Sequence, residues 1–116
     1  MRLDADTIRV GHMLDAAREA LHYAAGQTRE SLDANPMLVR AVIKCLEIIG
    51  EAASRVTAET RTQLSDVPWG DIVAMRNRLI HTYFDIDLDI VWTTVEIDLP
   101  AILPPLEQWL RTRNPQ

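Results

Sequence analysis

Side chains suited to phosphodiester chemistry gather in residues 76–83, which read Arg-Asn-Arg-Leu-Ile-His-Thr-Tyr. A guanidinium can hold two phosphate oxygens at once, and an imidazole can accept or release a proton near neutral pH. Arg76 and His81 are therefore candidates for a pair that cleaves a phosphodiester bond. Asn77 could orient His81 or a phosphate, and Arg78 could hold a neighbouring phosphate.

The spacing of this pair does not by itself build a site. An α-helix turns about 100° per residue, so Arg76 and His81 would point roughly 140° apart on a regular helix. Either the helix ends or distorts just before His81, or two copies of the segment face each other in a dimer. A structural interpretation stays open beside these: the cations favour the helix C-terminus and pair with Asp71 or Asp85, His81 caps the helix, and Tyr83 packs in the core.

Helix signals divide the chain into four segments. The first runs from about Asp4 or Asp6 to Ala25, and a polar loop over 27–34 follows. Asn35-Pro36 is a typical N-cap with Pro at the first helical position, and it opens a helix over about 36–63. A third helix begins near Pro68 or Trp69. The last begins after Asp85-Ile86-Asp87, and we expect Pro100 to kink it and Pro104-Pro105 to bend or break it.

These four segments predict an all-α protein, an antiparallel four-helix bundle with a kinked C-terminal helix. The helix over 36–63 is apolar on more than one side, so it must bury both sides. One face would pack in the internal core and the other against a second subunit, where Gly50, Ala52 and Ala53 would allow close approach. The sequence therefore predicts a homodimer. The apolar face of the third helix is expected to hold Trp69, Ile72, Val73, Leu79 and Ile80.

Size and composition predict one soluble domain over residues 1–116. Hydrophobic residues are 47% and charged residues 25% of the chain, as in ordinary globular proteins. Cys45 is the only cysteine, so no intrachain disulfide can form. The N-terminus does not resemble a signal peptide, and no apolar run approaches the roughly 18 residues of a membrane span. We therefore expect a cytoplasmic protein that does not enter a membrane.

The net charge of −5 argues against a protein that grips nucleic acid over a broad surface. The charge is uneven, however. Residues 82–110 carry six carboxylates and no Lys or Arg, whereas residues 37–81 carry six Lys or Arg against five carboxylates. A focal anion site should therefore lie in the middle of the chain. His12, His22 and Cys45 are scattered rather than spaced as metal ligands, so we expect no metal.

Residues 76–83 resemble the Arg-x-x-x-x-His-x-Tyr signature of HepT-like ribonuclease toxins, which belong to the HEPN superfamily of small helical domains. Residues 41–53 resemble the long second helix of that family around its Leu-Glu-Ile-Ile-Gly-Glu-Ala pattern. Residues 69–87 resemble its third helix and the following turn. The resemblance covers almost the whole chain, with both blocks in the right order. Thr82 departs from the small residue, often Gly, that the family places between His and Tyr.

The resemblance implies a metal-independent endoribonuclease with no cofactor, in which Arg76 and His81 cut RNA and Asn77 supports them. It also implies a homodimer that brings the two motifs together in a cleft. Tyr83 would be adenylylated, with ATP as the AMP donor, by a cognate nucleotidyltransferase antitoxin of the MNT class. The chain would then be the toxin of a type VII-like toxin–antitoxin pair, acting on an RNA such as tRNA or mRNA.

Two non-enzymatic interpretations remain beside this one. The same fold could be the binding half of a two-protein nucleotidyltransferase, holding nucleotide through Arg76 and Arg78 without cutting anything, with its acidic C-terminal half as a docking surface. It could also be a purely structural helical dimer. A nuclease arrests growth when expressed alone, and His81→Ala relieves that arrest. A structural dimer tolerates Ala at both Arg76 and His81.

Overall fold

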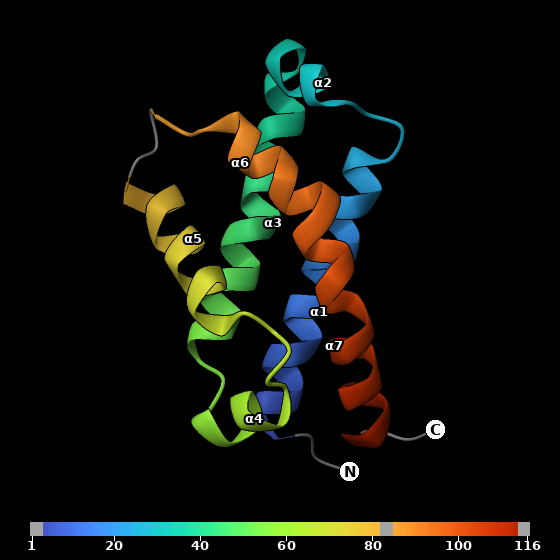
Figure 1. Cartoon of the computed structure of the whole chain (residues 1–116), viewed down its shortest axis with the longest axis vertical. Helices are drawn as coiled ribbons and strands as arrows, with labels where there is room; N and C mark the ends of the chain where they lie inside the picture. Colours follow the sequence, from blue (N-terminus) through green and yellow to red (C-terminus); the bar gives the residue numbers. More distant parts are fainter. Residues whose placement is uncertain (1–3, 82–84, 114–116) are drawn as a thin grey trace.

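A computed structural model of the chain describes residues 4–81 and 85–113, and these form helices without any strand (Figure 1). This confirms the prediction of an all-α protein. The elements in chain order are α1 (Ala5–Ala24), α2 (Arg29–Ala34), α3 (Pro36–Ser54), α4 (Ala58–Gln63), α5 (Trp69–His81), α6 (Leu88–Thr93), the π-helical segment η1 (Thr94–Asp98) and α7 (Leu99–Arg113). None of these helices combines the length and apolar character needed to span a lipid bilayer.

Side-chain caps open three of the helices where the sequence predicts them. Asp4 accepts a hydrogen bond of 2.7 Å from the backbone N–H three residues on, at the start of α1. Asn35 caps α3 in the same way at 3.2 Å, with Pro36 at the first helical position. Asp87 accepts from two backbone N–H groups at the start of α6. Each cap satisfies an amide that has no partner inside its helix.

Two boundaries differ from the expectation. The segment 27–34 is not wholly a loop, because α2 occupies most of it. Thr28 opens α2, and its backbone N–H donates to the Ser31 hydroxyl at 3.0 Å. The helix expected over 36–63 is also wrong as a single element, because α3 ends at Ser54 and α4 begins at Ala58.

Contacts with α1 explain the break between α3 and α4. Thr57 is the N-cap of α4, and both its backbone N–H and its hydroxyl donate to the Asp6 carboxylate in the first turn of α1. The Thr60 hydroxyl donates to the same carboxylate at 2.6 Å. These bonds turn the chain away from the α3 axis, and they tie α4 to the start of α1.

Helix α3 lies at the centre of the molecule, with α1 packed on one side and α5 on the other (Figure 1). The second apolar face of α3 is therefore largely covered by its own chain. A Cβ built on Gly50 would lie only 2.1 Å from the Cβ of Arg76, so this glycine serves the contact between α3 and α5. The expectation that Gly50 faces a second subunit is wrong for that reason. Ala52 and Ala53 are likewise buried within the chain.

In the C-terminal segment α6–η1–α7, α7 packs along α1 and η1 touches it, whereas α6 contacts α2 (Figure 1). The π-helical turn of η1 lies immediately before Pro100, and the Leu99 N–H donates to the Thr94 carbonyl five residues back. Proline has no N–H, and its ring clashes with the carbonyl four residues earlier, so a widened turn at this point relieves the conflict. Pro104 and Pro105 lie inside α7 without breaking it.

The apolar face predicted for α5 is correct except at one residue. Trp69 and Leu79 are buried, and Ile72 and Val73 pack partly against the core. Ile80 is 45% exposed, because it faces an open groove rather than the core. That groove also contains Arg76.

Candidate functional site

Arg76 projects from α5 toward α3, where a carboxylate meets it. Its Nη2 lies 2.6 Å from Oε2 of Glu51, and its Nη1 donates to Oδ1 of the adjacent Asn77 at 3.1 Å. The guanidinium is thus held on two sides. Asn77 is exposed, and its side-chain oxygen holds the Arg76 guanidinium; its predicted role of orienting His81 or a phosphate stays a prediction.

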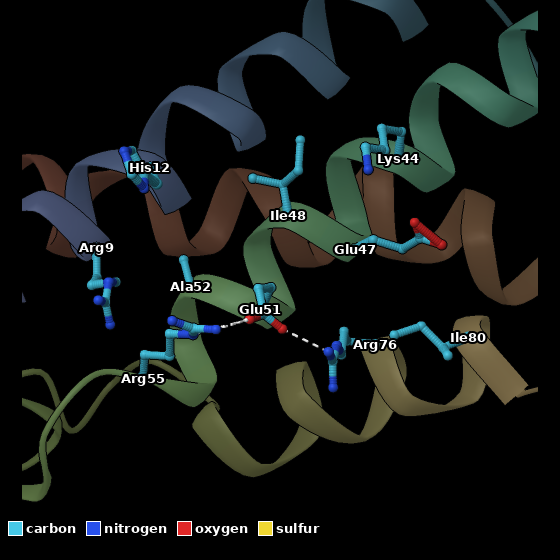
Figure 2. Close-up of a pocket in the computed structure, with 10 residues that line it drawn as sticks. All are labelled: Arg9, His12, Lys44, Glu47, Ile48, Glu51, Ala52, Arg55, Arg76 and Ile80. Carbon is cyan, nitrogen blue, oxygen red and sulfur yellow. Dashed lines mark hydrogen bonds and ion pairs between the residues drawn. The ribbon is translucent and has the colours of Figure 1, made fainter.

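The other oxygen of Glu51 binds a second arginine. Oε1 accepts from Nε of Arg55 at 3.0 Å and lies 2.9 Å from its Nη2, so one carboxylate bridges two guanidiniums (Figure 2). The side chains of Arg76, Glu51 and Arg55 are 29%, 43% and 59% exposed. Ion pairs as open as these stabilise a protein by about 0–1 kcal/mol. A competing anion can therefore replace Glu51 at little cost.

Gly50 sets the distance between these groups. The missing side chain lets the stem of Arg76 lie directly on the α3 backbone, since a Cβ would also meet the Arg76 Cγ at 2.7 Å and the Ile72 carbonyl at 3.3 Å. Glu51 is the next residue of α3, so the close approach at Gly50 brings its carboxylate within reach of Arg76. Packing between two helices thus builds the ion pair.

Arg76 lies at one wall of an open groove of about 510 Å³ between α1, α3 and α5 (Figure 2). The groove carries more positive than negative charge, although the protein as a whole is acidic. Its lining residues are Arg9 and His12 from α1, Lys44, Glu47, Ile48, Glu51, Ala52 and Arg55 from α3 and its C-cap, and Arg76 and Ile80 from α5.

The remaining motif residues divide between two locations. Arg78 is exposed and lines a separate small depression with Asp85, Ile86 and Asp87, on a different side of α5 from Arg76. The structure therefore does not bring Arg76 and Arg78 together. His81 is the last residue of α5, and its side chain lies outside the described part of the structure, as does all of Tyr83. The pairing of Arg76 with His81 stays a prediction.

Glu51 is the site residue that sequence reasoning missed. It is 25 positions from Arg76, and no local spacing links the two. The sequence held two signals. Glu51 stands in the Leu-Glu-Ile-Ile-Gly-Glu-Ala pattern, and it lies four residues before Arg55, a spacing that puts opposite charges together on a helix. Neither signal indicates the second arginine.

Two other candidate chemistries receive no support from the described residues. Burial raises the pKa of the Cys45 thiol to about 11, so it is not poised as a nucleophile. Within residues 4–81 and 85–113, no group of three or more His, Cys, Asp or Glu side chains is placed to hold a metal ion.

Comparison with known proteins identifies the family. The family model described as Ribonuclease HepT-like matches residues 13–109. The chain belongs to the HepT-like ribonuclease family. The matched range includes the groove residues of α3 and α5, but it begins after Arg9 and His12.

Individual relatives of this HepT-like chain carry ribonuclease names. It is 36% identical over 95 residues to "Putative RNase MJ1380" of Methanocaldococcus jannaschii, which covers 82% of this chain and 87% of the relative. It is 34% identical over 100 residues to "Putative RNase TTE0752" of Caldanaerobacter subterraneus subsp. tengcongensis, with 86% and 89% covered. It is 38% identical over 68 residues to "Probable ribonuclease HepT" of Thermococcus cleftensis, with 59% and 62% covered. No solved structure matches the chain significantly.

Proposed function

We propose that this HepT-like chain is a metal-independent endoribonuclease and the toxin of a type VII-like HEPN/MNT toxin–antitoxin pair. The observation that carries the proposal is the family match over residues 13–109, which includes Arg76 and its partner Glu51. The substrate would be RNA such as tRNA or mRNA, and the site of action the cytoplasm. No cofactor takes part.

The proposed reaction is transesterification followed by release of the leaving strand. The ribose 2′-oxygen forms a bond to phosphorus while the bond from phosphorus to the 5′-oxygen breaks. His81 takes the proton from the 2′-hydroxyl or gives one to the leaving 5′-oxygen. Arg76 leaves Glu51 and stabilises the charge on the non-bridging oxygens, with Asn77 still holding its Nη1. The products are a 2′,3′-cyclic phosphate and a 5′-hydroxyl.

A homodimer is part of the proposal. The backbone of α5 stays helical through Ile80 to His81, so it offers no distortion that would bring His81 back to Arg76 within one chain. In a symmetric dimer of antiparallel four-helix bundles, Arg76 of one copy could meet His81 of the other. Covalent adenylylation of Tyr83 by an MNT-class nucleotidyltransferase, with ATP as donor, would then silence the site, because AMP adds negative charge and bulk close to the end of α5.

The catalytic proposal is tested by incubating purified protein with RNA in excess EDTA. Cleavage should persist in EDTA, and it should fall by at least about 100-fold in His81→Ala and in Arg76→Ala, the size expected when general acid–base or electrostatic catalysis is removed. Abolition by EDTA, or full activity of His81→Ala, would contradict the mechanism. Analysis of the RNA ends checks for the cyclic phosphate.

The silencing proposal has its own measurement. Intact-mass spectra of protein co-expressed with the antitoxin should show AMP adducts that disappear in Tyr83→Phe. An inactive complex in which the chain carries no adduct would instead indicate that the antitoxin blocks the site sterically.

A second candidate function is the non-catalytic, nucleotide- or partner-binding half of a two-component nucleotidyltransferase. The exposed carboxylates of Asp85, Asp87 and Asp89 favour it, since they offer a docking surface for a basic partner. Expression of the chain alone separates the two functions. Growth arrest that His81→Ala relieves supports the nuclease, and normal growth supports the binding subunit.

A further inference from the structure

The groove beside Arg76 contains cations that the Arg-x-x-x-x-His-x-Tyr motif does not include. Arg9 comes from α1, and Lys44 and Arg55 come from α3 and its C-cap. With Arg76 they give four positive charges against the two carboxylates of Glu47 and Glu51, a surplus of two with His12 neutral. A positive groove on a protein of net charge −5 is a local feature that attracts anions.

Glu51 marks a position in the groove where an anion is bound from two sides. Its two oxygens each meet a different guanidinium, Arg55 at 2.9–3.0 Å and Arg76 at 2.6 Å. A phosphodiester also presents two anionic oxygens, and arginine binds such oxygens with the same forked geometry. Because the pair is half-exposed, phosphate can take the place of the carboxylate.

Two further cations lie along the groove. Among the described residues, neither the Arg9 nor the Lys44 side chain makes a hydrogen bond or a close ion pair, although the charge of Arg9 acts on Asp6 in the same helix. Lys44 and Arg55 are eleven residues apart along α3, a separation of roughly 16 Å at 1.5 Å per residue. Figure 2 shows them toward opposite ends of the groove, with Arg9 and Arg55 near one end. More than one phosphate of a strand fits along such a length, since each nucleotide rises ~3.4 Å along the axis of a stacked strand and its phosphates lie farther apart when the strand is extended.

The groove also offers apolar surface to the bases. Ile48 and Ile80 both line it, and they are 37% and 45% exposed. Apolar side chains between cations allow a strand to place its phosphates on the charges while its bases cover the isoleucines. This arrangement suits an extended single strand better than a duplex, whose bases are already stacked and paired.

We propose that this groove binds the backbone of single-stranded RNA on one side of the cleaved bond, with Arg55 and Arg9 holding phosphates beyond the one at Arg76. The assignment rests on the proposed ribonuclease function and extends it to a substrate-binding surface. Arg9 lies outside the family match over residues 13–109, so that match gives it no role. In the proposed dimer the second copy would reach only the Arg76 wall of the groove. It fits the remainder less well, because self-contact would press two surfaces of surplus positive charge together.

The test measures both cleavage kinetics and equilibrium binding of a labelled single-stranded RNA by the full chain. Binding is measured at several salt concentrations in the inactive His81→Ala background. Arg9→Gln should raise KM and Kd roughly tenfold with kcat nearly unchanged, as expected when one charged group that binds phosphate is removed. Arg55→Gln should raise Kd by a similar factor, and it is judged from binding alone because Arg55 shares the Glu51 carboxylate with Arg76. Each should also make the salt dependence of log Kd shallower by about 0.7 for every phosphate that the variant no longer neutralises. Arg9→Lys should restore most of the affinity.

Arg111→Gln is the matched control, because Arg111 is an exposed arginine of α7 that does not line the groove. It makes the same charge change and should leave KM, Kd and the salt slope unchanged. Lys44→Gln provides an independent groove variant if Arg9→Gln folds poorly, and thermal melts check folding in every case.

The outcomes distinguish this proposal from the one on which it rests. If the unaltered protein cleaves RNA but Arg9→Gln, Arg55→Gln and Lys44→Gln bind as it does, the groove assignment is overturned and the ribonuclease function stands. If the unaltered protein neither binds nor cleaves RNA, the proposed function itself fails. If the groove variants lose dimer in analytical ultracentrifugation while the salt slope for RNA stays the same, the groove is an interface between copies and the RNA assignment is overturned.

Discussion

Replacing Gly50 by alanine tests how helix packing builds the Arg76 site. The new Cβ would lie 2.1 Å from the Arg76 Cβ and 2.7 Å from its Cγ. Carbon atoms normally pack no closer than ~3.5 Å, so α5 must move away from α3 by about 1.4 Å at this point. The clash is with the stem of Arg76 rather than its flexible end, so a change of rotamer cannot remove the Cβ contact.

Two effects on stability oppose each other in Gly50→Ala. Overpacking of a buried contact costs about 1–3 kcal/mol, whereas alanine favours a helix over glycine by about 1 kcal/mol. We therefore expect a net destabilisation of up to about 2 kcal/mol, or a fall in Tm of up to about 8 °C for a chain of this size. Activity should suffer more, because a 1 Å shift of a catalytic group can cost about 100-fold.

Gly11→Ala is the control for this experiment. Gly11 also lies within a helix, but a Cβ there meets nothing within 4 Å. That variant should gain about 1 kcal/mol from helix propensity and keep full RNA cleavage. Thermal melts and cleavage assays on both variants suffice. A Gly50→Ala protein that gains stability as Gly11→Ala does, with normal cleavage, would refute the packing argument.

Two further predictions concern the partly buried carboxylate of Asp6 and the buried thiol of Cys45. Burial alone would raise the pKa of Asp6, but hydrogen bonds from Thr57 and Thr60 outweigh burial and lower the pKa. These hydrogen bonds therefore stabilise the fold at pH values above the unfolded pKa near 3.8. Their contribution is lost as the pH falls through the lower pKa of the folded state. Thr60→Val should therefore cost about 1 kcal/mol in urea titrations at pH 7 and less near pH 2, and an equal cost at both pH values would count against the bond to the carboxylate. Burial raises the pKa of the Cys45 thiol to about 11. Cys45 should therefore react with iodoacetamide at pH 8 at least about 100-fold more slowly in the native protein than in urea. Rapid labelling of the native protein would contradict the burial of this thiol.

Local signals predicted the helix starts well. The caps at Asp4, Asn35 and Asp87 depend on a side chain and a backbone N–H only a few residues away, so the sequence contains all that is needed. The break between α3 and α4 also has a local cap, since the Thr57 hydroxyl accepts from the Thr60 N–H at 3.4 Å, but the bond that ties Thr57 to Asp6 joins residues 51 positions apart and has no local signal. Helix α2 has six residues, too few to show a periodicity.

In the candidate site, too, the features with a local signal could be predicted and those that depend on distant contacts could not. Arg76 and Asn77 were selected as candidates from their residue types, and their contact follows from being adjacent. The role of Glu51 depends on how α5 docks on α3, and that docking depends on the absence of a side chain at Gly50. The sequence pattern around Gly50 suggested close approach to a second subunit, since an apolar stripe gives no indication of which helix will cover it. Ile80 was placed in the core for the same reason.

Helix α5 packs mainly against α3, and Trp69 at its start also donates to the Leu64 carbonyl at the end of α4 and lies under the Arg61 guanidinium. In the language of native-state hydrogen exchange, a helix docked mainly on one neighbour can open as a cooperative unit of its own, at a free energy below that of global unfolding. The helix that carries Arg76 would then exchange its amide protons before α1 and α3 do. Such an opening would separate Arg76 from Glu51 while the rest of the fold stays intact, so the site could exchange its internal carboxylate for an incoming anion without unfolding the protein.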